Sequence, residues 1–292
     1  MDTRTTLAKK ACLLRLSALS LAEGMRSGSF RSLYRGQGIE FSGVREYLRG
    51  DDVRTIDWNV TARMGRPFVK TFNEERELDV FIIVDASLSM DCGSGRQSRL
   101  DKAMECATLL TLASLQNASP VGAVIFGGEM LFSCPPAGGE EQTLLLLSQF
   151  EKKRNGRKGG TALDSALQGA GKLLRKRTLV MVFSDFRTGD WLAPFGRLCQ
   201  GNDVVAARIS APFDERLPAV GAVPFSDAES GGRCVLPTSS KAFQTAWLDA
   251  HRQRTAAWRK ECIRHGGIPL ELSTEQDSAA ELTRFFEARE IR

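Results

Sequence analysis

A short polar loop that follows an apolar run carries the residues best suited to chemistry. Residues 80–84 read Val-Phe-Ile-Ile-Val, and the next five are Asp85, Ala, Ser87, Leu and Ser89. A continuous apolar run that ends in small polar residues predicts a strand buried on both faces. The loop would then lie at the carboxyl end of the strand, where open α/β sheets bind ligands. One carboxylate and two hydroxyls supply hard oxygen donors, which suit Mg²⁺ or Mn²⁺.

A purely structural role would explain the same loop without a metal. Asp85 would then cap the turn from the strand to a following helix, and Ser87 and Ser89 would favour the turn itself. The preceding strand favours the metal site, because a motif gains weight from its predicted context.

The Asp-x-Ser-x-Ser loop resembles the metal-ion-dependent adhesion site of von Willebrand factor A domains. This resemblance implies two more ligands, a threonine and an aspartate, each beside an element of its own. Thr161 lies in Gly-Gly-Thr-Ala-Leu at the start of a helical pattern, and Asp185 follows a second apolar run at residues 178–184. In such sites an open position on the metal accepts a carboxylate of a partner. The implied ligand set is Asp85, Ser87, Ser89, Thr161 and Asp185.

Composition is ordinary for a globular protein: 42% of the 292 residues are hydrophobic and 26% are charged. A net charge of +5 is too mild to indicate nucleic-acid binding, and no apolar stretch is long enough to predict membrane insertion. The seven cysteines include no Cys-x-x-Cys pair, which argues against a disulfide framework and structural zinc and favours the cytoplasm. With only two histidines, a Ser-His-Asp catalytic set is poorly supplied.

The densest basic cluster of the chain comes directly before Thr161. A solvated loop is the simpler interpretation. Alternatively, the cluster forms a rim near the metal that selects an acidic partner. Its members are Lys152, Lys153, Arg154, Arg157 and Lys158.

Alternating strand and helix patterns predict an α/β fold with a doubly wound, mostly parallel sheet of the Rossmann type. We expect residues 78–211 to form this core with the metal site, and residues 239–292 to complete it as helix, strand and helix. Residues 1–77, which begin with a helix at about 4–23, are expected to form a small β-rich satellite subdomain. A β-hairpin at residues 212–238 is expected to join that satellite.

Charges of both signs alternate with single large apolar residues in the stretch Gly-Asp-Asp-Val-Arg-Thr-Ile-Asp-Trp at residues 50–58. Buried or partly buried charges are normally paired. We therefore expect the carboxylates of this region to pair internally with its arginines. The alternative is that one of them binds the metal of a neighbouring molecule. The residues concerned are Asp51, Asp52 and Asp57 with Arg45, Arg54 and Arg63.

The stretch from Gly36 to Met90 is similar to the signature of the DUF58 family, bacterial proteins that carry a von Willebrand factor A domain. The likeness covers essentially the whole chain and includes Pro-Pro-Ala-Gly-Gly at residues 135–139, Phe-Ser-Asp-Phe at 183–186 and Phe-Phe-Glu-Ala-Arg at 285–289. Members are typically encoded beside MoxR-type AAA+ ATPases. The resemblance therefore implies such an ATPase, or its client, as a partner.

These observations favour a binding protein: a Mg²⁺-dependent adaptor, and not an enzyme. The alternative is a Mg²⁺-dependent phosphohydrolase with the same ligands, in which the metal activates water or holds phosphate. That alternative lacks a clear general base. The run Gly-Arg-Lys-Gly-Gly at residues 156–160 also lacks the spacing of a phosphate-binding P-loop.

Overall fold

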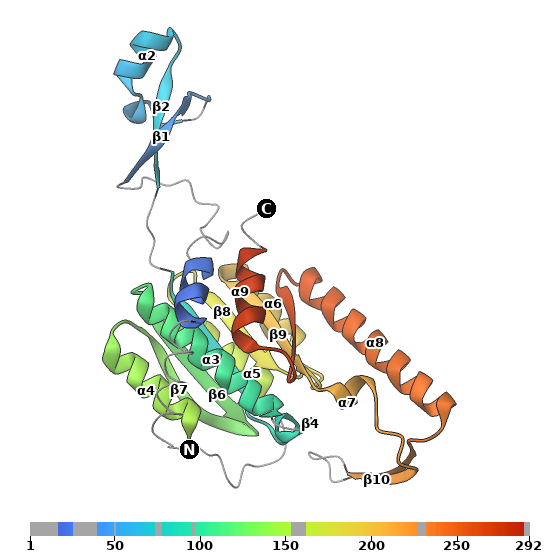
Figure 1. Ribbon diagram of the computed structural model, residues 1–292. Coiled ribbons are helices and arrows are strands. Elements are labelled where there is room, and N and C mark those ends of the chain that lie inside the picture. The colour runs from blue at the N-terminus through green and yellow to red at the C-terminus, as the bar shows by residue number, and fades with distance from the viewer. Residues whose placement is uncertain are drawn as a thin grey trace, which may run out of the picture. The chain divides into compact units, whose positions relative to one another are not determined.

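The computed structural model describes residues 17–25, 40–49, 51–73, 78–94, 97–152, 162–226 and 232–288 (Figure 1). The chain divides into two compact units. The smaller unit is Ser29–Glu77, and the larger consists of Met1–Gly28 with Leu78–Arg292. Each unit is described by itself.

A six-stranded sheet forms the centre of the larger unit, in the order β12-β9-β8-β3-β6-β7. β7 is antiparallel to β6, and all other neighbours are parallel. The predicted α/β fold with a mostly parallel sheet is therefore confirmed. The strands are β3 (Val80–Asp85), β6 (Val121–Gly127), β7 (Glu129–Ala137), β8 (Leu179–Ser184), β9 (Asp203–Ser210) and β12 (Ile268–Ser273).

The sheet is wound in two directions from its middle. β3 is followed by β6 on one side, whereas β8, β9 and β12 follow one another on the other side. The direction thus reverses between β3 and β8, which are paired neighbours. Open α/β sheets bind ligands at the carboxyl edge where this reversal occurs. Asp85 is the last residue of β3 and Asp185 comes directly after β8, so both lie at this edge.

Helices cover both faces of the sheet. Figure 1 shows α3 (Arg99–Gln116), α4 (Glu140–Glu151) and α9 (Ser278–Glu287) on one face, with α5 (Leu163–Leu173) and α6 (Leu192–Gly201) behind the sheet. Every residue of β3, β6 and β8 is buried as a result. This explains why these strands are continuous apolar runs and not alternating patterns. Of the helices that the structure describes, none is both long and apolar enough to cross a bilayer.

A helix at residues 17–25 packs within the larger unit. Ala18, Leu21, Ala22 and Met25 are buried, and the Asn117 side chain at the end of α3 donates to the Ala22 carbonyl at 2.9 Å. The helix predicted at about residues 4–23 is thus present from residue 17 onward, and residues 4–16 lie outside the described part of the chain. Its apolar stripe is buried in the larger core, whereas the sequence grouped it with the segment up to residue 77.

The remaining predicted elements of the larger unit are also found. The long helix α8 (Lys241–Arg264) precedes β12 and α9, as expected for residues 239–292. β10 (Ala222–Ser226) and β11 (Arg233–Pro237) form the expected hairpin, which clusters with the larger unit. That this hairpin joins the smaller subdomain stays a prediction. Short elements not expected from the sequence are the 3-10 helix η2 (Leu88–Asp91), the ribbon β4 (Gly93–Ser94) with β5 (Gln97–Ser98), and α7 (Pro212–Glu215).

The smaller unit is built on an antiparallel pair, β1 (Glu40–Glu46) with β2 (Phe68–Asn73). Between these strands lie the 3-10 helix η1 (Val53–Thr55) and the helix α2 (Trp58–Met64). Gly65 ends α2 with a φ of 67°, a left-handed conformation that favours glycine.

Only one of the predicted carboxylate–arginine pairs is formed in the described part of this unit. Arg45 donates two hydrogen bonds to Asp51, each of 2.7 Å. Asp52 instead caps η1, and Asp57 caps α2. The expectation of arginine partners was wrong for these two, because the free N–H groups at a helix start also need acceptors.

Replacing Asp51 with alanine is expected to destabilise the smaller unit. The change removes both acceptors of the half-buried Arg45 and the acceptor of the Leu48 N–H, so the free energy of unfolding of this unit should fall. Hydrogen exchange of residues 40–73 in the full-length protein measures the effect. Glu46→Ala is the matched control, because its ion pair with Arg66 is exposed and contributes little. Equal protection in wild type and Asp51→Ala would contradict the assignment.

Candidate metal site

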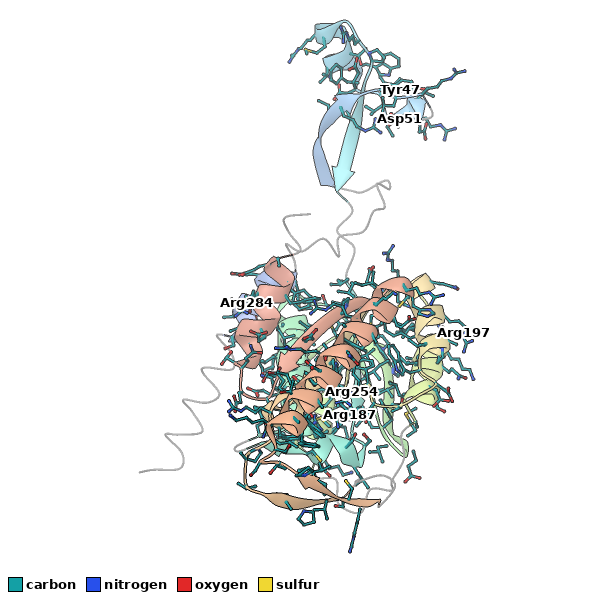
Figure 2. All side chains as sticks on the ribbon, turned by 90° about the vertical axis from the view of Figure 1, so that its right-hand side faces the viewer. Tyr47, Asp51, Arg187, Arg197, Arg254 and Arg284 are labelled. Atoms are coloured by element: carbon teal, nitrogen blue, oxygen red, sulfur yellow. The ribbon has the colours of Figure 1, made fainter. Side chains whose placement is uncertain are left out.

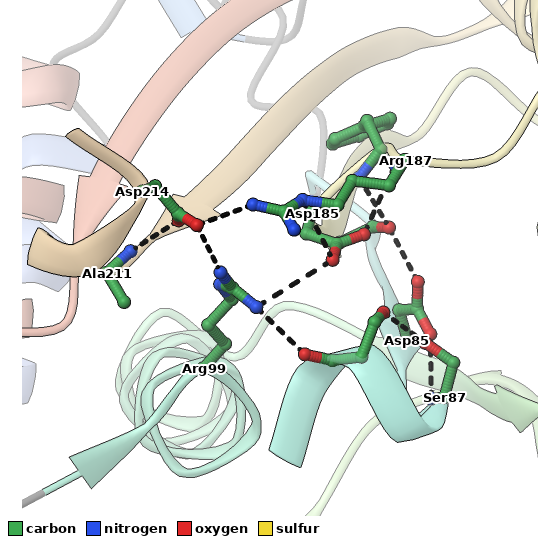
Figure 3. A network of polar contacts seen from close by, with 10 residues as sticks. Asp85, Ser87, Arg99, Asp185, Arg187, Ala211 and Asp214 are labelled. Atoms are coloured by element: carbon green, nitrogen blue, oxygen red, sulfur yellow. Dashed lines mark hydrogen bonds and ion pairs between the residues drawn. The ribbon is translucent and has the colours of Figure 1, made fainter. Parts of the chain in front are cut away.

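Polar groups from the loop after β3 and from the end of β8 contact the Asp85 carboxylate. Asp85 is fully buried. One of its oxygens, Oδ1, accepts the Ser87 N–H at 2.9 Å, and Oδ2 accepts the Ser184 hydroxyl at 2.6 Å (Figure 3). The hydroxyls of Ser87 and Ser89 lie 3.1 Å apart. The loop therefore places one carboxylate and two hydroxyls together, as the spacing predicts.

Gly127 at the end of β6 allows this loop to lie close to the sheet. A Cβ at Gly127 would stand 2.6 Å from the carbonyl oxygen of Ala86. The Ala86 N–H also donates to the Phe126 carbonyl at 2.6 Å. Any larger residue at position 127 would push the loop away from β6, so glycine here helps to fix the position of the loop.

Asp185 completes a pair of buried carboxylates. It is 3% exposed, and its Oδ1 accepts the Arg187 N–H at 3.2 Å. Its Oδ2 is buried and accepts no hydrogen bond from any residue that the structure describes. A buried carboxylate oxygen without a donor is costly. This oxygen is the clearest sign that the site takes a further ligand.

The backbone beside Asp185 is held in an uncommon conformation. Phe186 has a φ of 52°, which is rare for an aromatic residue. The conformation is maintained by packing, because the centroid of the Phe186 ring lies 4.9 Å from the ring centroid of Trp191 and 5.7 Å from the ring centroid of Trp258. The Ser184 hydroxyl also accepts the Phe186 N–H at 3.0 Å. Strain of this kind is frequent where a side chain must be aimed at a ligand.

Burial and the charge of Asp185 together perturb the Asp85 carboxyl. Burial, and then the charge of Asp185, raise the pKa of Asp85 to about 6, although the hydrogen bonds from Ser184 and Ser87 oppose the shift. A divalent cation between the two groups would reverse this cost, because it stabilises the ionised form of both. Hydroxyl and carboxylate oxygens are the donors that Mg²⁺ prefers. The residues present therefore fit the implied metal.

Two arginines lie on the Asp185 side of the site (Figure 3). Arg99, the first residue of α3, donates to the Ser89 carbonyl at 2.8 Å, and its nearest nitrogen is 4.0 Å from Asp185 Oδ2. Arg187 Nε is 3.6 Å from the same oxygen. Neither contact is a hydrogen bond, so the arginines neutralise Asp185 without filling its free lone pairs.

Asp214 from α7 holds both arginines in place. Its Oδ1 accepts from Arg99 at 2.6 Å and from Arg187 at 2.5 Å, and its Oδ2 accepts the Ala211 N–H at 2.9 Å. Burial alone would raise the pKa of Asp214, but the two guanidinium groups lower it below the ordinary value. Asp214 therefore stays ionised and draws both arginines away from the two carboxylates of the candidate site.

The structure thus brings together four of the five predicted ligands, Asp85, Ser87, Ser89 and Asp185. Thr161 lies outside the described residues, as do Lys153, Arg154, Arg157 and Lys158 of the basic cluster. Lys152 is described, and it is an exposed residue directly after α4. The roles predicted for Thr161 and for the basic cluster stay predictions.

Sequence reasoning missed Ser184, Arg99, Arg187 and Asp214. Ser184 belongs to the Phe-Ser-Asp-Phe motif, so its place beside Asp185 was a usable signal. Arg99 and Asp214 are 115 positions apart and carry no local pattern. Within the described residues no group of three or more His, Cys, Asp or Glu side chains converges; the donors gathered here are two carboxylates and hydroxyls.

Comparison with known proteins gives the family. The family model described as "Protein of unknown function DUF58" matches residues 43–257. The chain belongs to this family. An uncharacterized protein of Mycobacterium tuberculosis (strain ATCC 25618 / H37Rv) is 30% identical over 284 residues, which are 94% of this chain and 87% of that protein. An uncharacterized protein of Mycobacterium avium is 30% identical over 156 residues, covering 51% of this chain and 88% of that protein.

The solved structures that align with this DUF58 protein are only distantly similar to it. An aerotolerance-related membrane protein from Bacteroides fragilis aligns with a TM-score of 0.49 and 19% identity, over 73% of this chain and 98% of that chain. The pilus adhesin SpaC from Lactobacillus rhamnosus GG aligns with a TM-score of 0.41 and 12% identity, over 75% of this chain and 31% of that chain. Neither likeness is close enough to carry an inference about function.

The raised pKa of Asp85 predicts a pH-dependent effect of Asp85→Asn. In metal-free buffer, the wild type loses stability as pH rises through about 6, because the folded pKa lies above the unfolded value of 3.8. Asparagine cannot ionise, so at pH 8 the variant should be more stable than wild type by about 3 kcal/mol. This difference should disappear towards pH 4. Denaturant unfolding in EDTA at several pH values measures it.

Two comparisons make this result specific to the site. Asp203→Asn alters a carboxylate at the amino end of β9, at the opposite edge of the sheet, and should gain no stability at pH 8. Added Mg²⁺ should stabilise the wild type but not Asp85→Asn, since binding to the folded state shifts unfolding by mass action. An Asp85→Asn variant that is less stable than wild type at pH 8 in EDTA would contradict the analysis.

Proposed function

We propose that the larger unit is a von Willebrand factor A-like domain that uses a bound Mg²⁺ or Mn²⁺ to capture a protein partner. The observation that carries the proposal is the pair of buried aspartates at the reversal point of a mostly parallel sheet, one of which has an oxygen that lacks a donor among the described residues. Asp85, Ser87, Ser89 and Asp185 would hold the ion, and Thr161 is the fifth ligand that the motif implies.

The chemistry required of the metal is simple. A bound divalent ion supplies a coordination position that a carboxylate of the partner can fill. Other residues of this chain position the groups around the ion. Ser184 holds the Asp85 carboxylate, and Asp214 holds the guanidinium groups of Arg99 and Arg187, which would otherwise compete with the ion for the carboxylates. No observation favours the phosphohydrolase alternative, so we propose a binding function without catalysis.

The partner that we propose is a MoxR-type AAA+ ATPase, its client protein, or both, and the role is that of an adaptor in a chaperone-like or complex-maturation process. Support comes from membership of the DUF58 family and from the ATPase association that the family resemblance implies. A cytoplasmic location goes with this proposal. It agrees with the six cysteines that the structure describes, which are free thiols.

The proposal predicts that partner binding needs both the metal and Asp85. The purified chain should bind the ATPase encoded beside its gene in Mg²⁺, and binding should fall by at least tenfold in EDTA or in Asp85→Ala. A tenfold loss corresponds to about 1.4 kcal/mol, less than expected for a charge-assisted contact through a metal. Surface plasmon resonance with immobilised ATPase measures the affinities.

The controls separate loss of the site from loss of the fold. Asp203→Ala removes an acidic residue at the opposite edge of the sheet and should bind as wild type does. Circular dichroism of Asp85→Ala should match wild type. Binding that is equally strong in EDTA and in Asp85→Ala would show that the metal site does not serve this partner.

A further inference from the structure

We propose that Arg187 is the second contact for the partner's carboxylate, beside the metal, and that metal and carboxylate therefore bind this site together. The inference rests on the proposed function. It adds the residue that makes the site selective for an acid, a residue outside the predicted ligand set.

Arg187 is the accessible member of the arginine pair. Its side chain is 45% exposed, whereas that of Arg99 is 1% exposed. The Nη2 atom of Arg187 donates to Asp214, and Nε faces Asp185 at 3.6 Å. Its Nη1 donates no hydrogen bond to any residue that the structure describes. The guanidinium is thus held by two acids and keeps donors available beside the candidate metal position.

The position of Arg187 is fixed by the same features that fix Asp185. The Arg187 N–H donates to Asp185 Oδ1 at 3.2 Å, and the preceding Phe186 is held by packing against Trp191 and Trp258. A donor that is already oriented loses little entropy when a ligand arrives. A planar guanidinium is also well suited to carboxylates, which it can contact alongside another cation.

The charges of the site explain why metal and acid should bind together. Asp85, Asp185 and Asp214 are set against Arg99 and Arg187, and Arg208 also interacts electrostatically with Asp185 and Asp214. When all of these groups are ionised, the three negative charges match the three positive ones. Glu271 also interacts with Arg208, but it is itself paired with Arg259. A divalent ion therefore adds two positive charges to a buried position, where uncompensated charge is costly.

A carboxylate of the partner would reduce this excess of positive charge. One of its oxygens would complete the coordination of the metal, and the other would accept from Arg187 Nη1. Each ligand then raises the affinity for the other by the same factor, because coupling between two bound ligands is reciprocal. A simple open metal site without the arginine would bind the ion more strongly in the absence of any acid.

The test measures Mn²⁺ affinity of the full-length protein from the EPR signal of the free ion. Titrations are made alone, with blocked aspartate (N-acetyl-aspartyl-amide), and with blocked asparagine as the neutral control ligand. Blocked aspartate should raise the Mn²⁺ affinity of the wild type by about tenfold, and blocked asparagine should not change it.

Arg187→Gln should have opposite effects on the two ligands. Its Mn²⁺ affinity without ligand should equal or exceed that of the wild type, because a positive charge beside Asp185 has been removed. The gain from blocked aspartate should be largely lost. A merely structural defect would instead lower both affinities. Arg197→Gln, an exposed arginine of α6 that lies well away from Arg187 in Figure 2, is the matched control.

The outcomes are distinct. Full coupling to blocked aspartate in Arg187→Gln, or no coupling in the wild type, would overturn the role of Arg187 while leaving the metal site intact. Absence of Mn²⁺ binding to the wild type would remove the proposed function and this inference together. If Arg187→Gln fails to fold, Arg187→Lys decides: it keeps the charge, and loss of coupling with normal Mn²⁺ affinity would support the contact.

Discussion

Two like charges buried side by side are the constraint to which the rest of the site responds. Asp85 and Asp185 are both almost completely removed from water, and the charge of Asp185 makes ionisation of Asp85 less favourable. The hydroxyl of Ser184, the amide of Ser87 and the positive charges of Arg99 and Arg187 each offset part of this cost. One oxygen of Asp185 still has no donor among the described residues. A bound cation would interact favourably with this oxygen and with both negative charges.

The topology of the larger unit explains why these charges meet. β3 and β8 are adjacent and parallel, although 93 residues lie between the end of β3 at Asp85 and the start of β8 at Leu179. Their carboxyl ends therefore lie at one edge, at the place where the winding of the sheet reverses. Apolar packing on both faces makes the strands rigid supports. Further elements are drawn to the same edge by Asp214, which links the start of α3 to α7 and to the segment after β8.

Much of this arrangement could be predicted from the sequence, because strands buried on both faces leave continuous apolar runs. The runs before Asp85 and Asp185 located both carboxylates and the parallel sheet. The contacts of Arg99 with Asp214 could not be predicted, since they depend on tertiary packing between distant segments. For Asp52 and Asp57 the prediction was wrong. Their charges suggested arginine partners, whereas their side chains cap the helices that begin directly after them. The helix at residues 17–25 was predicted, but the core in which it is buried was not.

The central claim is that a divalent ion binds between the carboxylates of Asp85 and Asp185. Anomalous diffraction from crystals grown in Mn²⁺ tests it most directly. The account predicts an anomalous peak at this position, with at least one oxygen of Ser87, Ser89 or the two aspartates within about 2.2 Å. It would be contradicted by crystals in which the same concentration of Mn²⁺ gives no peak there, with a guanidinium group of Arg99 or Arg187 bonded to both carboxylates instead.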